Sequence, residues 1–439
     1  MREASPPITL PQRSGPTARS VFDLTAAAPP ARSLYLHIPF CFHKCHYCDF
    51  YSIVDTRDRQ EPFNERLLRE LDAIAPFAGP IRTVFVGGGT PTLLRPDLWE
   101  RLLGRLAASF DLGSLEEFTV ECNPETLTPE LAAVLRAGGV NRMSIGAQSF
   151  NTTHLKTLER WHDPETVPRA VELAKAAGIV RASIDLIFAI PGQTLEDWDR
   201  DLDAALALGT EHLSCYALTY EPGTAMTKRL ELGRFEPADE DLEAEMFTHT
   251  RTRLAAEGLD AYEVSNFARR GAECAHNLAY WRHADWLAAG PSASGHRAGC
   301  RWKQTPRLDD YLVKGETEPD TTGLASGCAP LSDLEPPDQA RNLSERIMTG
   351  LRLREGLDAD AVLADAASIG EPVRDELQRR VASHAANGRL LEQAGRWVLT
   401  EPGVLFADGI AADLMAALTP HGEPQLSRPP AARRSDPDA

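Results

Sequence analysis

Three cysteines crowd into a short stretch near the start of the chain. Cys41, Cys45 and Cys48 have the spacing C-x3-C-x2-C, while the other five cysteines are scattered through the remaining sequence. Thiolates are the usual protein ligands of iron–sulfur clusters, which commonly take four of them. Three thiolates on a four-iron cube leave one iron open, and a small molecule can bind there through amino and carboxylate groups. The spacing therefore predicts a [4Fe–4S] cluster with one exchangeable position.

Zinc is the alternative occupant of these cysteines. Zinc takes four ligands, and His43 or His46 would complete a Cys3His set. A secreted disulfide scaffold would be smaller and denser in cysteine, so we interpret the cluster as metal-binding in a reducing compartment. Residues 1–32 lack the apolar stretch of a secretory signal, and no apolar run approaches membrane-spanning length. We therefore expect a cytoplasmic protein.

A second set of unusual residues follows the predicted strands. Glycines at 87–89 would let a ligand approach the backbone closely. Glu121 and Gln148 end two further strands, and a buried carboxylate without a partner is costly enough to suggest function. Arg160 could clamp a carboxylate with its planar guanidinium. Asp185 is a charge in an otherwise apolar strand, with a structural salt bridge as the alternative interpretation.

A repeating strand-then-helix pattern positions these residues. Strands are predicted at 34–38, 82–86, 118–122, 142–147, 183–187 and 213–218. In the first helix, one face carries Phe63, Leu67, Leu68, Leu71 and Ile74, and the opposite face carries Glu65, Arg66, Arg69 and Glu70. Six such units imply parallel strands. Because the unusual residues all end strands, a barrel, in which those ends converge, is favoured over an open sheet.

The predicted fold class is α/β, with an incomplete (β/α)6 barrel over residues 33–260. An irregular, aromatic-rich α+β extension is expected at 261–330, and a small helical domain at 331–418 whose hairpin near 388–400 suggests a winged helix. Residues 1–32 and 419–439 are predicted disordered tails. The net charge of −18 argues against nucleic acid as the main partner, so the winged helix is expected to be structural or to dock a protein.

Three motifs give the chain a specific resemblance. The segments 35–41 (Y-L-H-I-P-F-C), 88–91 (G-G-T-P) and 146–150 (G-A-Q-S-F) are similar to the radical S-adenosylmethionine (SAM) family, in the branch of anaerobic coproporphyrinogen III oxidase and the heme chaperone HemW. The resemblance runs from about residue 35 to 406 and departs from the family at 290–294. It implies that the three cysteines hold the cluster. It also implies SAM contacts by Tyr35, Tyr47, Gly88, Gly89, Thr90, Glu121, Gln148, Arg160 and Asp185, and less securely by Ala217.

Within this branch, several positions separate the two groups. The oxidase group has a further cysteine where this chain has Phe50, whereas the HemW group has Phe. Segments 218–224, 262–267 and the H-N-x-x-Y-W element at 276–281 also resemble HemW. The resemblance implies a protein that binds heme as cargo and passes it to an unidentified acceptor, membrane-bound acceptors included. Oxidative decarboxylation of coproporphyrinogen III is the alternative, and whether the chain is an enzyme is left open.

His276 is the candidate heme ligand. An imidazole is a common axial ligand, and Tyr280 and Trp281 could form walls for a flat macrocycle. The alternative is that His276 belongs to a packing cluster with its hydrogen bonds already satisfied. Cys274 is a second, lower-ranked candidate ligand.

Overall fold

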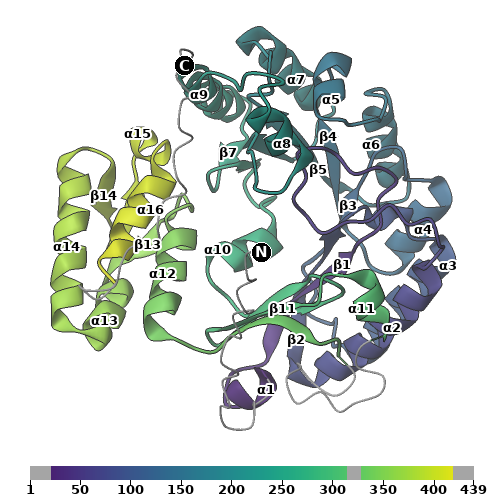
Figure 1. Cartoon of the computed structure of the whole chain (residues 1–439), viewed down its shortest axis with the longest axis horizontal. Coiled ribbons are helices and arrows are strands. Elements are labelled where there is room, and N and C mark those ends of the chain that lie inside the picture. Colours follow the sequence, from purple (N-terminus) through teal and green to yellow (C-terminus); the bar gives the residue numbers. More distant parts are fainter. Residues whose placement is uncertain (1–20, 314–327, 419–439) are drawn as a thin grey trace, which may run out of the picture.

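The computed structural model describes residues 21–313 and 328–418, and its centre is a curved sheet of six parallel strands with helices on the outer side (Figure 1). The strands are adjacent in chain order: β1 (Ala31–Ile38), β2 (Ala78–Gly88), β3 (Glu117–Cys122), β4 (Arg142–Gln148), β5 (Arg181–Phe188) and β6 (His212–Ala217). The connecting helices are α2 (Gln60–Ile74), α3 (Pro96–Ser109), α4 (Pro129–Ala137), α5 (Thr152–Thr157), α6 (Thr166–Ala176) and α7 (Leu195–Ala207). The predicted incomplete (β/α)6 barrel is confirmed.

The extension is α+β as predicted, but its strands continue the sheet at both edges. Beyond β6 lie β8 (Asn266–Ala268) and β7 (Asp260–Ala261). Beyond β1 lie β9 (Trp286–Ala289), which pairs with β1 in parallel, then β10 (Ser294–Arg297), β11 (Cys300–Gln304) and β12 (Leu331–Glu335). The sequence did not predict these strands because they are only two to five residues long and lie in a segment that lacks the strand-then-helix repeat of the barrel.

The extension also changes what α2 buries. Arg66 and Glu70 were predicted on the solvent face, but they are 2% and 0% exposed. The Arg66 Nε donates to the Tyr311 carbonyl at 3.2 Å, and Glu70 accepts hydrogen bonds from the Tyr311 hydroxyl at 2.7 Å and the Gly290 N–H at 2.9 Å. Tyr311 lies in α11 (Leu308–Val313). The prediction was wrong because a segment more than 200 residues away covers this face.

Three helices link the barrel to its extension and the rest of the chain: α8 (Ala225–Glu231), α9 (Glu240–Ala256) and α10 (Ala275–Trp281). The C-terminal part comprises α12 (Gln339–Gly350), β13 (Leu357–Asp358), α13 (Ala359–Ile369), α14 (Glu371–Ala386), β14 (Leu390–Gln393), β15 (Arg396–Leu399), α15 (Glu401–Val404) and α16 (Ala407–Ala416). Its strands form a separate sheet in the order β13-β15-β14 around a core of its own, which matches the winged-helix prediction (Figure 1).

The terminal segments and the domain boundaries differ in part from the predictions. Residues 1–20 and 419–439 lie outside the described residues. Residues 21–32, predicted as tail, instead contain α1 (Val21–Leu24) and the start of β1, fixed by Arg297, whose guanidinium donates to Thr25 Oγ1 at 3.1 Å and the Ala28 carbonyl at 2.9 Å. The main sheet continues through β12, past the predicted boundary at 330. In the described ranges, no helix has the length and apolarity to cross a membrane.

Candidate functional site

A cavity of about 1500 Å³ lies against the C-terminal ends of the barrel strands. This is larger than the roughly 300–1,000 Å³ of a typical small-molecule pocket. All thirteen residues predicted to hold the cluster or SAM line it: Tyr35, Cys41, Cys45, Tyr47, Cys48, Gly88, Gly89, Thr90, Glu121, Gln148, Arg160, Asp185 and Ala217. The fold thus brings together residues that span more than 180 positions of sequence, and their roles as ligands remain predictions.

The cysteine loop follows β1 and is fastened to the chain on both sides. The Cys41 N–H donates to the Ile53 carbonyl, and the Ile53 N–H donates to the Pro39 carbonyl, both at 2.8 Å. Cys45 is buried, and the Arg160 Nη1 lies 3.8 Å from its sulfur. All three thiols are free. A guanidinium beside the loop would offset the negative charge of thiolate ligands, so the local chemistry fits a cluster.

The zinc alternative finds less support in this geometry. Among the described residues, the ligand atoms that approach one another within 4.8 Å as a set of three belong to His283, His296 and Glu345, and not to the cysteine loop. His46 already accepts a hydrogen bond from the Arg229 guanidinium at 3.1 Å. Sulfurs spread apart suit a multi-iron cluster better than a single ion.

The glycine triplet is required by close packing inside the cavity wall. A Cβ atom on Gly87 would lie 2.8 Å from Glu121 Oε2, and one on Gly89 would lie 2.7 Å from the Phe40 carbonyl oxygen. Gly88 has φ +111°, a backbone conformation that residues with a side chain rarely adopt. Its N–H donates to Glu121 Oε2 at 3.0 Å. The triplet therefore seats Glu121 and the start of the cysteine loop against the end of β2.

Glu121 and Asp185 form an acidic pair in the cavity. Removal from bulk water, followed by the nearby Asp185, raises the pKa of Glu121 to about 7. Burial also raises the pKa of Asp185, which accepts hydrogen bonds from Ser144 Oγ at 2.9 Å and Ser183 Oγ at 3.0 Å. Hydroxyl groups hold Asp185, so the salt-bridge interpretation does not describe it. Two buried acids close to each other, whose hydrogen bonds come from neutral donors, favour a cationic ligand, which is the character of SAM.

The remaining predicted contacts lie on β4 and beyond it. Gln148 has φ 65° where the register of β4 shifts against β5, which turns its side chain out of the strand pattern. Arg160 is anchored by the Gly146 carbonyl, 2.9 Å from its Nη2. Ser144 and Ser214 also line the cavity and were missed. A small polar residue in an otherwise apolar strand was the available signal for both.

His276 does not face the cavity, and its imidazole is fully buried. Its Nδ1 lies 2.8 Å from Thr83 Oγ1 and its Nε2 lies 2.9 Å from the Tyr280 hydroxyl. Burial lowers its pKa to about 4. In this conformation His276 is therefore not open to heme, and its contacts are those of the satisfied packing cluster. Tyr280 and Phe85, whose rings contact that of His276, both line the cavity.

Cys274 is also buried and hydrogen-bonded within the protein. Its Sγ donates to Glu117 Oε1 at 3.2 Å, it is fully buried, and burial raises the pKa of its thiol to about 12. A thiol held in this way is neither deprotonated nor accessible. The structure does not offer Cys274 as a heme ligand.

The exposed residues that line the cavity, here called its rim, include apolar side chains from the C-terminal part of the chain as well as the acidic residues Glu240 and Asp241 at the start of α9. Phe50 is 63% exposed, and Leu405 and Phe406 are 43% and 47% exposed. These three residues line the cavity together with Phe247 of α9. Exposed aromatic and aliphatic side chains grouped at a cavity mouth are typical of a site for an apolar ligand.

Comparison with known proteins agrees with this geometry. Residues 35–205 match the Radical SAM superfamily, and residues 338–406 match the HemN C-terminal domain. The heme chaperone HemW of Mycobacterium tuberculosis is 35% identical over 87% of this chain and 94% of its own length. HemW of Escherichia coli is 33% identical over 87% of this chain and 97% of its own length.

A solved structure shares the same fold. The coproporphyrinogen III oxidase HemN from Escherichia coli superposes with a TM-score of 0.73 over 88% of this chain and 90% of the oxidase, at 21% sequence identity. At that identity the likeness concerns the fold and not the reaction.

Proposed function

The chain belongs to the radical SAM superfamily and, within it, to the HemW family, and from that membership we propose that it binds heme and passes it to an acceptor protein. The observation that carries the proposal is the cavity, which is lined both by every predicted cofactor residue and by the exposed apolar side chains Phe50, Leu405 and Phe406. A [4Fe–4S] cluster with SAM, when bound, supplies reductive cleavage of the SAM sulfonium. Cys41, Cys45 and Cys48 would hold the cluster, and Glu121, Gln148 and Asp185 would orient the SAM amino and ribose groups.

We propose that heme enters at the rim beside Phe50 and Phe406. A macrocycle needs flat apolar contact, which these exposed side chains offer. His276 remains the proposed axial ligand, but only after a change at α10. Its Nε2 must exchange the Tyr280 hydroxyl for iron, which requires Tyr280, a residue that lines the cavity, to turn away from the imidazole. The Nδ1 contact with Thr83 can persist and orient the ring, as partners of metal-bound histidines do.

The oxidase alternative lacks a supporting observation in this chain. Phe50 stands where the oxidase group has its further cysteine, and it is exposed at the cavity rim. We also propose a cytoplasmic location, supported by eight cysteines that are not joined in disulfides, as expected in a reducing compartment. The acceptor is unidentified, and a membrane-bound acceptor is compatible with the proposal.

Anaerobic heme titration of the reconstituted protein tests this function. We expect one heme per chain, with a Soret band that changes in His276→Ala while the cluster is retained. Coproporphyrinogen III should not be decarboxylated under the same conditions. Carbon dioxide release at even a small fraction of about one turnover per second would overturn the chaperone proposal, since enzymes typically reach that rate. An unchanged Soret band in His276→Ala would move the ligand elsewhere and leave the proposal of heme binding intact.

A further inference from the structure

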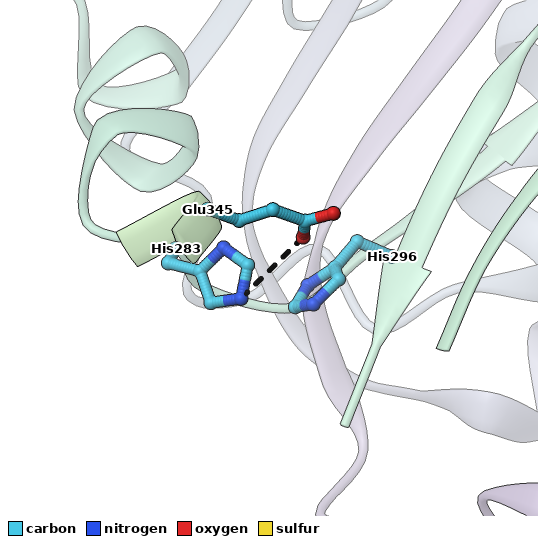
Figure 2. Close-up of side chains that lie close together, drawn as sticks. All are labelled: His283, His296 and Glu345. Atoms are coloured by element: carbon cyan, nitrogen blue, oxygen red, sulfur yellow. Dashed lines mark ion pairs between the residues drawn. The ribbon is translucent and has the colours of Figure 1, made fainter. Parts of the chain in front are cut away.

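A cluster of three potential metal ligands lies outside the cavity, where the extension meets the C-terminal part of the chain. His283 follows the end of α10, His296 lies on β10, and Glu345 lies on α12. Figure 2 shows the two imidazoles and the carboxylate directed toward one another. One ligand atom from each residue lies within 4.8 Å of the other two. Two neighbouring segments of the extension and the more distant helix α12 thus bring a His2Glu set to one point.

Both histidines direct an unpaired nitrogen into this cluster. The Nε2 atoms of His283 and His296 are buried and have no hydrogen-bond partner among the described residues. His296 is only 2% exposed, so water does not replace the missing partner freely. Buried polar atoms in native proteins are nearly always satisfied, and two unsatisfied nitrogens facing each other indicate a missing group.

The other nitrogen of His296 is held in the way that a metal-bound histidine requires. Its Nδ1 donates to the Ala284 carbonyl at 3.2 Å, because a carbonyl can only accept, and Asp285 Oδ1 lies 3.4 Å away. The proton is therefore on Nδ1 and the lone pair on Nε2. A carbonyl or carboxylate behind the imidazole is the usual outer partner of a metal ligand.

Glu345 contributes one free oxygen. Its Oε1 accepts a hydrogen bond from the Arg301 guanidinium at 2.8 Å, and Arg341 Nε lies 3.7 Å away. Its Oε2 lies 3.9 Å from His283 Nε2, which is too long for a hydrogen bond. A simple His–Glu ion pair therefore leaves the Nε2 of His283 without a hydrogen bond. The two guanidiniums hold the carboxylate so that a single oxygen faces the histidines.

We propose that His283, His296 and Glu345 bind a divalent transition-metal ion, with a fourth position open to water. Two imidazoles and one carboxylate suit Zn²⁺, with ligand distances of about 2.0–2.2 Å. Tetrahedral ligands at that distance lie roughly 3.3 Å apart, so modest side-chain rotations close the present spacing. The ion would tie α12 to the sheet extension, directly after the H-N-x-x-Y-W helix. The proposal does not depend on heme or SAM binding.

The test uses the full chain with its iron–sulfur cluster reconstituted and Zn²⁺ as the probe. After equilibration with micromolar Zn²⁺ and removal of free ion, we expect one zinc per chain in addition to the cluster iron. His296→Ala and His283→Ala should each retain no zinc, whereas the control His249→Ala should retain one. His249 is a suitable control because it pairs with a single carboxylate, Asp199, on the outer helices. Zinc should raise the Tm of the wild type and not that of the two variants.

X-ray absorption at the zinc edge separates this site from the cysteine loop. Nitrogen and oxygen ligands near 2.0–2.1 Å support the proposal, and sulfur ligands near 2.3 Å overturn it, because they would place zinc on the cysteines. A wild type that retains no zinc also overturns it, as does retention of zinc by both histidine variants. If His296→Ala fails to fold by circular dichroism, His283→Ala, at a half-buried position after the helix end, decides the outcome alone.

Discussion

Two carboxylates on strand β3 have opposite environments, although they lie four residues apart. Glu117, at the start of the strand, accepts hydrogen bonds from the Ala275 N–H at 2.9 Å and from Cys274 Sγ at 3.2 Å, and Arg181 lies 3.3 Å away. Glu121, at the other end, accepts one hydrogen bond, from the Gly88 N–H. The first carboxylate is fully paired within the protein, and the second faces a cavity with its pairing incomplete.

The difference appears in their pKa values. Burial by itself would raise the pKa of Glu117, but Arg142, the Ala275 N–H and Arg181 outweigh it, and the pKa is lowered. Burial and the neighbouring Asp185 raise the pKa of Glu121 to about 7. A satisfied buried charge indicates a structural role, whereas an unsatisfied one indicates a place for a ligand. The N-terminal end of β3 therefore contributes to stability, and its C-terminal end contributes to ligand binding.

The largest expected effect concerns the binding end. Cys45→Ala should give a folded protein whose iron content falls from about four per chain to nearly none, because a cube cannot be held by the two remaining thiolates. Iron and sulfide analysis after anaerobic reconstitution measures this. Cys300→Ala is the control, since Cys300 is equally buried but lies on β11 of the extension. Equal iron in Cys45→Ala and wild type would refute the ligand assignment.

The next effect concerns the structural end. Glu117→Gln should lower the free energy of unfolding by about 3–5 kcal/mol, because it leaves Arg142 and Arg181 without their compensating charge. Urea denaturation measures the change. Glu116→Gln is a matched control on the neighbouring residue: its carboxylate pairs with Arg82 at the surface, and its loss should cost less than about 1 kcal/mol. Equal effects of the two substitutions would remove the distinction between the two ends of β3.

The sequence predicted that the residues of the binding end lie together, as they do around the cavity, and their roles as ligands remain predictions. It did not predict the contacts of the structural end. Cys41, Glu121 and Asp185 were found because strand order and parallel pairing alone place C-terminal strand ends together. The role of His276 was not predictable in this way. Its environment depends on Thr83 and Glu117, which lie more than 150 residues away and reach it only because the extension folds back onto β2 and β3.

The extension shows the same limit of prediction from local sequence patterns. Glu70 has a helical pattern that places it in solvent, yet Tyr311 and Gly290 bury it. The His283 and His296 pair carried no local motif, because its third partner comes from the C-terminal helix α12. Local periodicity predicts elements and their ends, whereas contacts between distant segments decide which polar side chains are already satisfied.

A smaller effect, on ligand affinity and not on stability, distinguishes Glu121 from Glu117. Glu121→Gln should weaken SAM binding by about ten- to a hundredfold, the loss of one hydrogen bond to a charged group, with little change in the free energy of unfolding. Calorimetry measures the affinity. Gln148→Ala should behave in the same direction. Unchanged affinity in both variants would remove these residues from the site.

The pH dependence sharpens this prediction. A cationic ligand favours ionised Glu121, so the SAM affinity of the wild type should rise as the pH increases through about 7 and then level off. At pH 6 roughly a tenth of Glu121 is ionised, and the affinity should be about tenfold below its plateau. In the empty protein the raised pKa has the opposite consequence: the stability it contributes is lost as the pH rises through about 7. Glu121→Gln should flatten both profiles, and a wild-type affinity profile that is already flat would contradict the assignment.

The smallest expected effect, on heme affinity, tests whether the structural end of β3 also takes part in heme binding through His276. His276 belongs to the satisfied network around Glu117, but its Nε2 contacts the hydroxyl of Tyr280, a residue that lines the cavity. Tyr280→Phe keeps the ring and removes the hydroxyl that competes with iron for Nε2. Because a neutral hydrogen bond contributes about 1 kcal/mol, heme affinity should rise roughly fivefold, with the Soret position of the wild type. Thr83→Val is the informative partner, since it removes the Nδ1 contact that orients the ring and should weaken heme binding instead. If both substitutions leave heme affinity unchanged while His276→Ala also has no effect, His276 is purely structural, and the division between the two ends of β3 is complete.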